Sequence, residues 1–328
     1  MMTLKERVMP IKLQQLRALE KRLGRLSGKM KDDIALYEAG YRGEQNLDYH
    51  LGFLGVNEFE IVHDVRISNG RGNYFQIDTL VLTTQFFVIL EVKNMVGRFE
   101  FNDELKQMVR IWNGEEVLMQ NPLNQVRRQQ TQLSDWLLDR GFPLMPIEQL
   151  IVFANPSTIV HSTESGRHTL SKVVYAEGVV PRLEKLKLNY GKAKSYLDNV
   201  KLRKVAEQLK ASHSPLLTSI LKTYHLKPSQ LQKGVYCPSC RTPNMVRRGR
   251  SGNWHCQSCP ITSKTAHVQA LEDYYLLIKP TISSAELREF LGIESRVVAY
   301  HLLNKLDIKR THKNRHCYYH LTLPLKLK

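Results

Sequence analysis

The chain has 328 residues, and its 48 Lys and Arg against 31 Asp and Glu give a formal net charge of +17 at pH 7. A hydrophobic content of 42% excludes a generally disordered chain, and the length excludes a single small module. The positive charge favours a polyanionic partner such as nucleic acid. No stretch approaches the roughly 20 apolar residues that span a bilayer, and no secretory signal is visible, so we expect a cytoplasmic protein.

The charge is unevenly distributed. Residues 1–31 carry a net +7, residues 32–181 carry −8, residues 182–232 carry +8 and residues 233–328 carry +10. An acidic central block between basic flanks suggests that the centre holds the chemistry and the flanks attract a polyanion. The alternative is that the basic runs are only solvated helix faces.

Hydrophobic periodicity predicts the elements in chain order. Apolar positions three or four apart predict a basic amphipathic helix over residues 3–31 and a second helix over 31–54, which Gly40 and Gly43 interrupt. A period of two then predicts strands over 59–65, 74–82 and 86–93, which we expect to form an antiparallel meander.

The rest of the central block alternates strands and helices. The later predicted elements are strands over 106–112 and 116–119, a helix over 123–138, strands over 147–153 and 172–175, a helix from Pro181 and helical structure over 192–226. Such an order is typical of a mixed α/β layer structure. We expect five segments, with bounds at 1–31, 32–190, 191–232, 233–266 and 267–328.

Two carboxylates stand out on the predicted strands. If the hairpin closes around Thr84 and Gln85, Asp78 and Glu91 lie directly opposite each other, where two like charges are destabilising unless something compensates them. Lys93 points to the same face as Glu91. Hard oxygen ligands suit Mg²⁺ or Mn²⁺, so the pattern predicts a metal held by Asp78 and Glu91 with Lys93 beside the attacking water.

Alone, a Glu-x-Lys pattern is weak, because a surface ion pair produces it too. His63 and Asp64 form another candidate pair near a strand end, for which a structural histidine is the simpler interpretation.

These motifs carry a family resemblance. Asp78 followed by Glu91-Val92-Lys93 resembles the PD-(D/E)xK nuclease superfamily, with Ile77 standing where the superfamily's name has Pro. Together with Glu44 after Gly43, and Gln125 after Asn121-Pro122, the pattern more narrowly resembles the nuclease-related domain (NERD) family over about residues 30–190. The resemblance implies a restriction-endonuclease-like core in which Glu44, Asp78 and Glu91 serve the metal site, Lys93 serves catalysis and Gln125 supports the site. Glu44 and Gln125 could also be ordinary exposed residues.

Four of the five cysteines form two Cys-x-x-Cys pairs, namely Cys237, Cys240, Cys256 and Cys259. This spacing predicts a structural zinc ribbon, because four thiolates close the tetrahedral shell of one Zn²⁺. A redox role is the alternative. The ribbon also holds basic and aromatic residues suited to phosphate contact and base stacking, namely Arg247, Arg248, Arg250 and Trp254. Trp254 could instead pack the ribbon.

The last segment predicts helices over 268–278, 285–291 and 295–306 and a hairpin of strands 308–311 and 317–321. This order resembles a winged helix. The third helix and the wing would present residues to nucleic acid, namely Arg296, Tyr300, Lys309, Arg310, Lys313 and Arg315. A protein-interaction winged helix with a solvated wing is the alternative.

The sequence therefore predicts a magnesium- or manganese-dependent nuclease, a hydrolase of phosphodiester bonds, with a structural zinc ion. We expect DNA rather than RNA as the substrate, because winged helices most often dock on duplex DNA. The rival hypothesis is a non-catalytic DNA- or RNA-binding or regulatory protein with a degenerate nuclease core. A third hypothesis, a redox or small-molecule enzyme, has no support, since no phosphate-binding glycine loop followed by Lys and Ser or Thr appears in the sequence.

Overall fold

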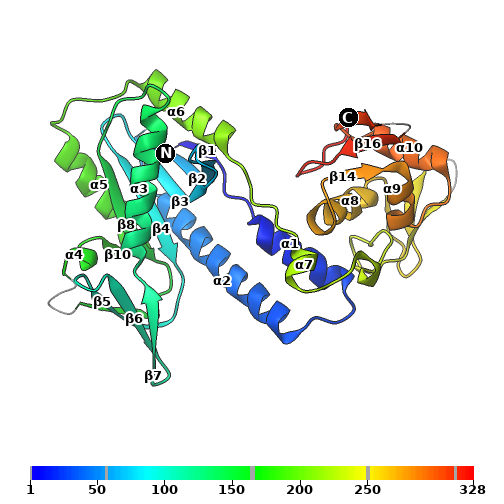
Figure 1. Cartoon of the computed structure of the whole chain (residues 1–328), viewed down its shortest axis with the longest axis horizontal. Helices are drawn as coiled ribbons and strands as arrows, with labels where there is room; N and C mark the ends of the chain where they lie inside the picture. Colours follow the sequence, from blue (N-terminus) through cyan, green and yellow to red (C-terminus); the bar gives the residue numbers. More distant parts are fainter. Residues whose placement is uncertain (1, 56–57, 163–166, 249–251, 314–315) are drawn as a thin grey trace. The chain divides into compact units, whose positions relative to one another are not determined.

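A computed structural model describes residues 2–55, 58–162, 167–248, 252–313 and 316–328 (Figure 1). The chain folds into two compact units, the first formed by Met1–Met9 with Leu36–Leu216 and the second by Pro10–Ala35 with Leu217–Lys328. Both units combine helices with β-sheets, so the predicted mixed α/β class is confirmed. Within the described ranges, no helix is long and apolar enough to cross a membrane.

A six-stranded mixed sheet forms the centre of the first unit. Its strands, in spatial order, are β1 (Met2–Lys5), β2 (Glu60–Ser68), β3 (Tyr74–Leu82), β4 (Phe87–Lys93), β8 (Ile147–Phe153) and β10 (Val173–Tyr175). The predicted meander is confirmed, since β2, β3 and β4 pair antiparallel. The other three strands join in parallel, which makes the sheet mixed.

Helices cover both faces of this sheet. Leu133 of α3 (Pro122–Leu138) and Val205 of α6 (Asn199–Ser212) belong to one hydrophobic cluster with Ile89 of β4. On the other face, α2 (Gly28–Leu51) and α5 (Val179–Tyr190) contribute to a second cluster with Val88 and Leu90. The alternation along β4 therefore buries both faces, as expected of a central strand.

A smaller sheet of four strands belongs to the same unit. In spatial order these are β7 (Glu115–Gln120), β6 (Gln107–Trp112), β5 (Gly97–Asn102) and β9 (Thr158–Ser162). The sequence predicts β6 and β7 but neither β5 nor β9. Along the chain, the short helix α4 (Arg167–Leu170) precedes β10, and a 3-10 turn at Ala176–Gly178 follows it.

The N-terminal segment differs from the expected single helix over residues 3–31. It begins with β1, continues into α1 (Ile11–Arg22) and breaks before α2. Pro10 stands immediately before α1, where its fixed φ and missing N–H are tolerated, whereas a helix running through this position would lose a hydrogen bond.

Helix α2 also differs from the expectation, because Gly40 and Gly43 do not interrupt it. A Cβ atom on Gly43 would lie 2.4 Å from the Cβ of Asn94, so glycine permits the close approach of the segment after β4. Asn94 then donates to the carbonyl of Ala39 at 2.6 Å. The basic connector is likewise broken, since α6 ends at Ser212 and the short α7 (Ile220–Thr223) follows Pro215.

The described residues of the second unit form two small sheets and, besides α1, α7 and the start of α2, three more helices. The first sheet is formed by β11 (Met245–Arg248), β12 (Asn253–Cys256) and β13 (Thr262–Ser263), and it follows a 3-10 turn at Pro228–Gln230. The remaining elements are α8 (Ala266–Leu277), β14 (Thr281–Ser283), α9 (Ser284–Leu291), α10 (Arg296–Asn304), β15 (Lys309–Lys313) and β16 (His316–His320). The sheet order β14-β16-β15 places the predicted hairpin beside a third strand.

Local signals set the helix ends in this unit. Ser283 and Glu286 form a capping box at the start of α9, and Gly292 ends that helix with a φ of 70°. Ser295 then caps α10. The order of helices and hairpin agrees with the expectation, whereas the winged-helix resemblance itself remains a prediction.

Candidate metal and nucleic-acid sites

The pairing of β3 with β4 follows the register expected for the hairpin. Thr79 pairs with Leu90 and Leu82 with Phe87, so the next step along the ladder brings Asp78 level with Glu91. The ladder stops before this step. Instead, Oδ2 of Asp78 accepts a hydrogen bond from the backbone N–H of Val92 at 3.0 Å. The Asp78 side chain thereby replaces a backbone partner where the two strands separate.

The same level of the sheet is distorted on β2 and β3. Ile77 and Leu80 contribute to one hydrophobic cluster although they are three residues apart, so the two-residue alternation breaks between them. The alternation also breaks on β2, the strand paired with β3, since Val62 and Val65 are three residues apart and belong to the same cluster. Asp64, the residue level with Asp78, has a φ of 47°. The break frees Asp78 from the regular strand.

Glu91 is a buried carboxylate held from both sides. Its side chain is 3% exposed, and Nζ of Lys93 lies 2.5 Å from its Oε1. Nε2 of Gln129 on α3 donates to Oε2 at 2.9 Å. Nζ of Lys93 also lies 3.3 Å from Oε1 of Gln125, one turn earlier on α3. The expectation that Lys93 and Glu91 share a face therefore agrees with the structure.

Burial raises the pKa of Asp78 well above its usual range. The neighbouring carboxylates of Glu91 and Glu44 raise it further, while Lys93 and the N–H of Val92 lower it. The cost of ionising Asp78 here comes from removing its charge from water beside two like charges. A cation bound at this carboxylate would relieve that cost.

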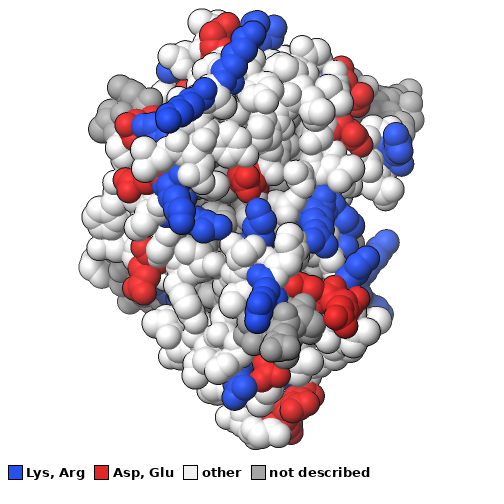
Figure 2. All heavy atoms as spheres, turned by 90° about the vertical axis from the view of Figure 1, so that its left-hand side faces the viewer, with Lys and Arg blue, Asp and Glu red and all other residues white. Residues whose placement is uncertain are grey.

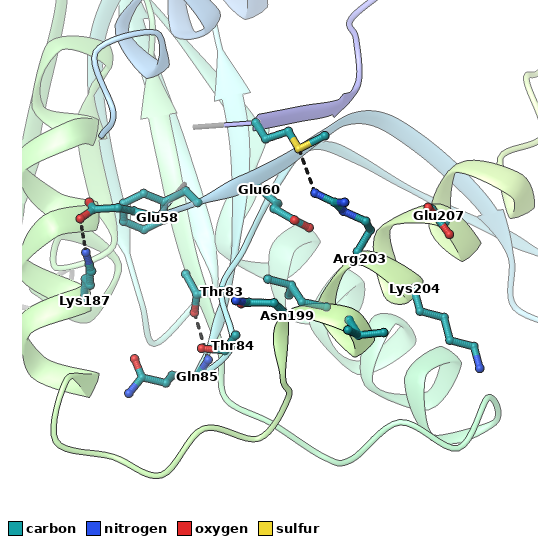
Figure 3. A pocket seen from close by; sticks show the side chains of 14 residues that line it. Glu58, Glu60, Thr83, Thr84, Gln85, Lys187, Asn199, Arg203, Lys204 and Glu207 are labelled. Carbon is teal, nitrogen blue, oxygen red and sulfur yellow. Dashed lines mark hydrogen bonds and ion pairs between the residues drawn. The ribbon is translucent and has the colours of Figure 1, made fainter. Parts of the chain in front are cut away.

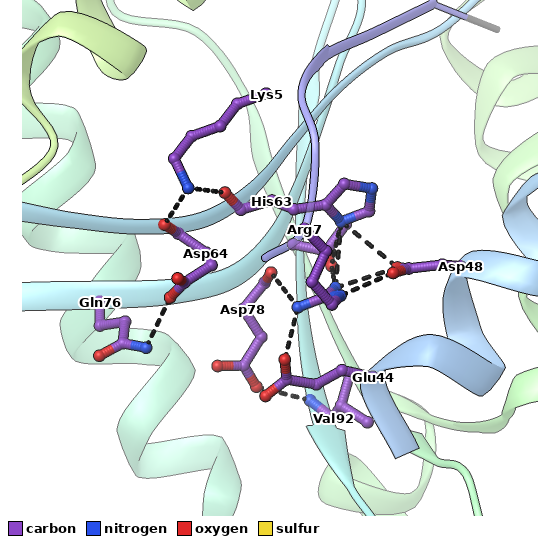
Figure 4. A network of polar contacts seen from close by, with 10 residues as sticks. Lys5, Arg7, Glu44, Asp48, His63, Asp64, Gln76, Asp78 and Val92 are labelled. Atoms are coloured by element: carbon purple, nitrogen blue, oxygen red, sulfur yellow. Dashed lines mark hydrogen bonds and ion pairs between the residues drawn. The ribbon is translucent and has the colours of Figure 1, made fainter. Parts of the chain in front are cut away.

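Glu44 lies beside Asp78 but is already ion-paired (Figure 4). A guanidinium nitrogen of Arg7 donates to Oε2 of Glu44 at 2.7 Å and contacts the main-chain oxygen of Asp78 at 3.3 Å. Burial raises the pKa of Glu44 to about 7, although the Arg7 ion pair lowers it. Burial and the Arg7 ion pair therefore act in opposite directions on the pKa of Glu44.

His63 lies next to the same guanidinium. The Nδ1 of His63 lies 3.0 Å from a terminal nitrogen of Arg7 and 3.1 Å from Oγ1 of Thr79. Burial, helped by the charges of Arg7 and Lys5 and opposed by Asp48, lowers the pKa of His63 to about 4. His63 is therefore neutral at pH 7, in line with the structural interpretation of this residue.

The donor set around Glu91 suits a hard divalent cation. Asp78 and Glu91 supply carboxylate oxygens, and the buried Oε1 of Gln129 has no hydrogen-bond partner among the described residues. Oxygen donors of this kind are what Mg²⁺ and Mn²⁺ prefer. Across the described ranges, however, no group of three carboxylates or histidines brings its ligand atoms within 4.8 Å of one another. Asp78 and Glu91 are therefore the two carboxylates that could hold such an ion.

Three residues of this site do not stand out in the sequence. Gln129 is signalled only by its position four residues after Gln125, which places both on one face of α3. Arg7 and Asp48 carry no motif, since their pairing joins residues 41 positions apart.

A hollow lies elsewhere in the first unit. It has a volume of about 1080 Å³, and its lining includes Thr83, Thr84 and Gln85 at the turn between β3 and β4 (Figure 3). Its lining mixes both charge signs, namely Glu58, Glu60, Lys187, Arg203, Lys204 and Glu207. None of the predicted catalytic residues lines it, so it is separate from the carboxylate site.

The four cysteines of the second unit converge on one point. Their sulfur atoms all lie within 4.8 Å of one another, with Cys237 and Cys259 3.6 Å apart and Cys240 and Cys256 3.5 Å apart. Tetrahedral Zn–S bonds of about 2.3 Å place sulfurs about 3.8 Å apart, so the cluster could hold one zinc ion.

Trp254 lies inside the zinc-ribbon segment. It is 2% exposed, and its indole N–H donates to Nδ1 of His267 on α8 at 3.2 Å. Burial lowers the pKa of His267 to about 4, which keeps this acceptor neutral. The structure thus uses Trp254 for packing, and its ring face is not available for stacking on a base.

The other predicted nucleic-acid contacts are on the surface or outside the described residues. Arg248, Arg296, Tyr300, Lys309 and Arg310 are exposed, and Arg247 is half-buried. Arg250 and Arg315 lie outside the described residues, as does the side chain of Lys313. On the face of the first unit drawn in Figure 2, basic and acidic side chains are interspersed.

A comparison with protein families identifies residues 39–154 as a match to the family described as NERD, nuclease-related domain. This segment contains Glu44, Asp78, Glu91, Lys93 and Gln125, and it excludes Arg7. Comparisons with curated proteins and with solved structures found no match.

Proposed function

Because residues 39–154 form a nuclease-related domain, we propose that this protein is a metal-dependent nuclease that hydrolyses phosphodiester bonds, with DNA as its substrate. One observation carries the proposal. Asp78 and the Glu91–Lys93 pair lie at the same level of two neighbouring strands, at the point where the β3–β4 ladder ends. A half-buried cluster of two carboxylates and a lysine is costly, which supports a catalytic role for it.

The residues have separate roles in this proposal. Asp78 and Glu91 would hold Mg²⁺ or Mn²⁺, which when bound lowers the pKa of a water ligand and offsets the charge that develops on the phosphate. Lys93 donates hydrogen bonds and would orient the attacking water. Gln129 keeps the Glu91 carboxylate in place, and Gln125 helps to keep the Lys93 ammonium in place.

The second unit would bind the nucleic acid. Zinc held by the four cysteines would fold the ribbon, and the exposed residues of α10 and β15 would contact phosphates. Arg296 and Tyr300 are exposed on one helix, and Lys309 and Arg310 on the hairpin that follows it. This arrangement supports a division of labour between the two units.

The test is a cleavage assay with the purified zinc-loaded protein. Supercoiled, linear and single-stranded DNA, and RNA, are incubated with Mg²⁺ or Mn²⁺, and the Asp78→Asn and Lys93→Met variants are compared with Lys192→Met, an exposed lysine of the same unit. We expect cleavage by the wild type and by Lys192→Met only. A wild type that binds nucleic acid but cleaves none of these substrates would support the rival, a non-catalytic binding protein.

A further inference from the structure

An N-terminal arm, residues 2–9, runs along the nuclease core. Its strand β1 pairs parallel with β2, with Met2 opposite Glu60 and Thr3 opposite Ile61. Nζ of Lys5 then donates to the main-chain oxygens of His63 and Asp64, at 2.9 and 2.8 Å. These contacts fix the arm next to the strand level that carries Asp78.

Arg7, at the end of this arm, is a buried cation surrounded by acceptors. Its side chain is 3% exposed. Nε and one terminal nitrogen grip the two carboxylate oxygens of Asp48 at 2.7 and 3.0 Å, a forked geometry that fixes the guanidinium plane. The terminal nitrogen that binds Asp48 also donates to Oγ1 of Thr79 at 2.7 Å. The second terminal nitrogen donates to Glu44 and to the main-chain carbonyl of Asp78.

Arg7 lies where a cation could bind between Glu44 and Asp78. Glu44 and Asp48 lie one turn apart on α2, and both are only about a quarter exposed or less. Without a counter-charge, two such carboxylates beside Asp78 would repel each other and would attract a divalent ion. Arg7 removes that attraction at Glu44, because it already occupies the carboxylate.

We propose that Arg7 is a positioning residue that supplies, from within the chain, the positive charge at Glu44 that a second cation would otherwise supply. Glu44 is then a ligand of Arg7 rather than of the metal, and the site takes one divalent ion, at Asp78 and Glu91. The inference rests on the proposed function for the metal site. Arg7 lies outside the matched segment of residues 39–154.

Manganese binding to the zinc-loaded full-length protein tests this directly. Titration calorimetry and Mn²⁺ electron paramagnetic resonance give the number of bound ions and their affinity without any cleavage step. We expect one Mn²⁺ per wild-type chain, lost in Asp78→Asn. Arg7→Gln should bind a second Mn²⁺ or bind the first about tenfold more tightly, because a nearby positive charge is gone.

Two further variants provide the controls. Arg7→Lys keeps the charge and should keep the wild-type stoichiometry. In the double variant Arg7→Gln with Glu44→Gln, the additional or tighter Mn²⁺ binding should disappear, because the carboxylate that attracts the extra ion is absent. Unchanged or weaker Mn²⁺ binding by a folded Arg7→Gln protein overturns the proposal.

Glu44→Gln alone gives an answer even if Arg7→Gln fails to fold. We expect its Mn²⁺ affinity to fall by no more than about tenfold, because only a nearby negative charge is lost, whereas loss of a direct ligand should abolish binding, as expected of Asp78→Asn. A complete loss contradicts the role given to Arg7. Absence of any Asp78-dependent Mn²⁺ in the wild type overturns the metal site and this inference together, while Mn²⁺ binding without cleavage contradicts the nuclease activity alone.

Discussion

Nζ of Lys93 lies 2.5 Å from Oε1 of Glu91, and the second oxygen of that carboxylate is held by Gln129. The pair is mostly buried, so the lysine is fixed in place by a carboxylate that is itself fixed. A lysine oriented in this way can donate to a water or to a phosphate oxygen without first being ordered. Its charge also offsets part of the repulsion between Glu91 and Asp78.

Replacing this lysine should separate catalysis from metal binding. Lys93→Met keeps the length of the side chain but removes its donor and charge, so we expect cleavage to fall by at least about 100-fold. Mn²⁺ binding should persist, because Asp78 and Glu91 remain. Cleavage rates and Mn²⁺ calorimetry on the same preparation check this. A Lys93→Met protein that cleaves at the wild-type rate would remove Lys93 from the catalytic machinery.

Gln129 should matter for stability as well as for orientation. Gln129→Ala leaves one oxygen of the buried Glu91 carboxylate without its donor, which costs about 1–3 kcal/mol. Denaturant unfolding measures the loss, and Gln132→Ala on the same helix is the matched control. Equal stabilities of the two variants would show that the Gln129 contact is energetically unimportant.

The sequence predicts the part of this site that lies on adjacent strands. The register of a hairpin is fixed once the position of its turn is known. Placing the turn at Thr84 and Gln85 therefore predicts that Asp78 and Glu91 lie opposite each other. The side-chain periods also predict β2, β3, β4, α3 and β8 within a few residues. These are long segments with a clear period, for which local pattern and tertiary structure agree.

The contacts that the sequence does not predict are long-range or depend on a local distortion. Arg7 meets Glu44 because β1 adds to the sheet, and no local pattern signals a parallel pairing between positions 2 and 60. Strand β5 begins at Gly97 with a φ of 125°, and β9 pairs with it in parallel across some sixty residues. The burial of Trp254 likewise depends on His267, which lies on α8.

Removing the charge of Asp78 should stabilise the metal-free protein. Burial and the neighbouring carboxylates raise the pKa of Asp78, so its folded form holds a proton at pH values where the unfolded chain has released it. That contribution to stability is present at low pH and is lost as the pH rises through the raised pKa. Asn cannot ionise, so Asp78→Asn should gain stability over the wild type between pH 5 and pH 8.

Unfolding in buffer without Mg²⁺ or Mn²⁺ measures this difference at several pH values. Added Mn²⁺ should stabilise the wild type, and more so at pH 8 than at pH 5, because protons compete with the ion at Asp78. Asp78→Asn should show no Mn²⁺ stabilisation. If Asp78→Asn is more stable than the wild type by the same amount at pH 5 and pH 8, the pKa of Asp78 is not raised.

Loss of zinc should unfold the ribbon and leave the nuclease core intact. Cys240→Ser removes one ligand of four, so we expect loss of bound zinc and exposure of the Trp254 side chain, seen as a red shift in fluorescence. Cys317→Ser is the matched control, because Cys317 lies on β16 outside the cluster. Mn²⁺ binding at Asp78 should be unchanged in both. Full zinc content in Cys240→Ser would overturn the four-cysteine site.

The exposed cations of β15 should set the salt dependence of nucleic-acid binding. Lys309 and Arg310 are exposed on the strand, so removing both should weaken binding to all DNA sequences alike. Each lost phosphate contact makes the negative slope of log K against log salt less steep by about 0.9 on duplex DNA. Losing both contacts should therefore reduce the steepness by up to about 2. Lys233→Ala is the control, because this lysine of the same unit is paired with Glu289 at 2.7 Å. Affinities measured between about 50 and 200 mM salt give the slopes. If the Lys309→Ala/Arg310→Ala slope equals that of Lys233→Ala, the hairpin does not contact the phosphate backbone.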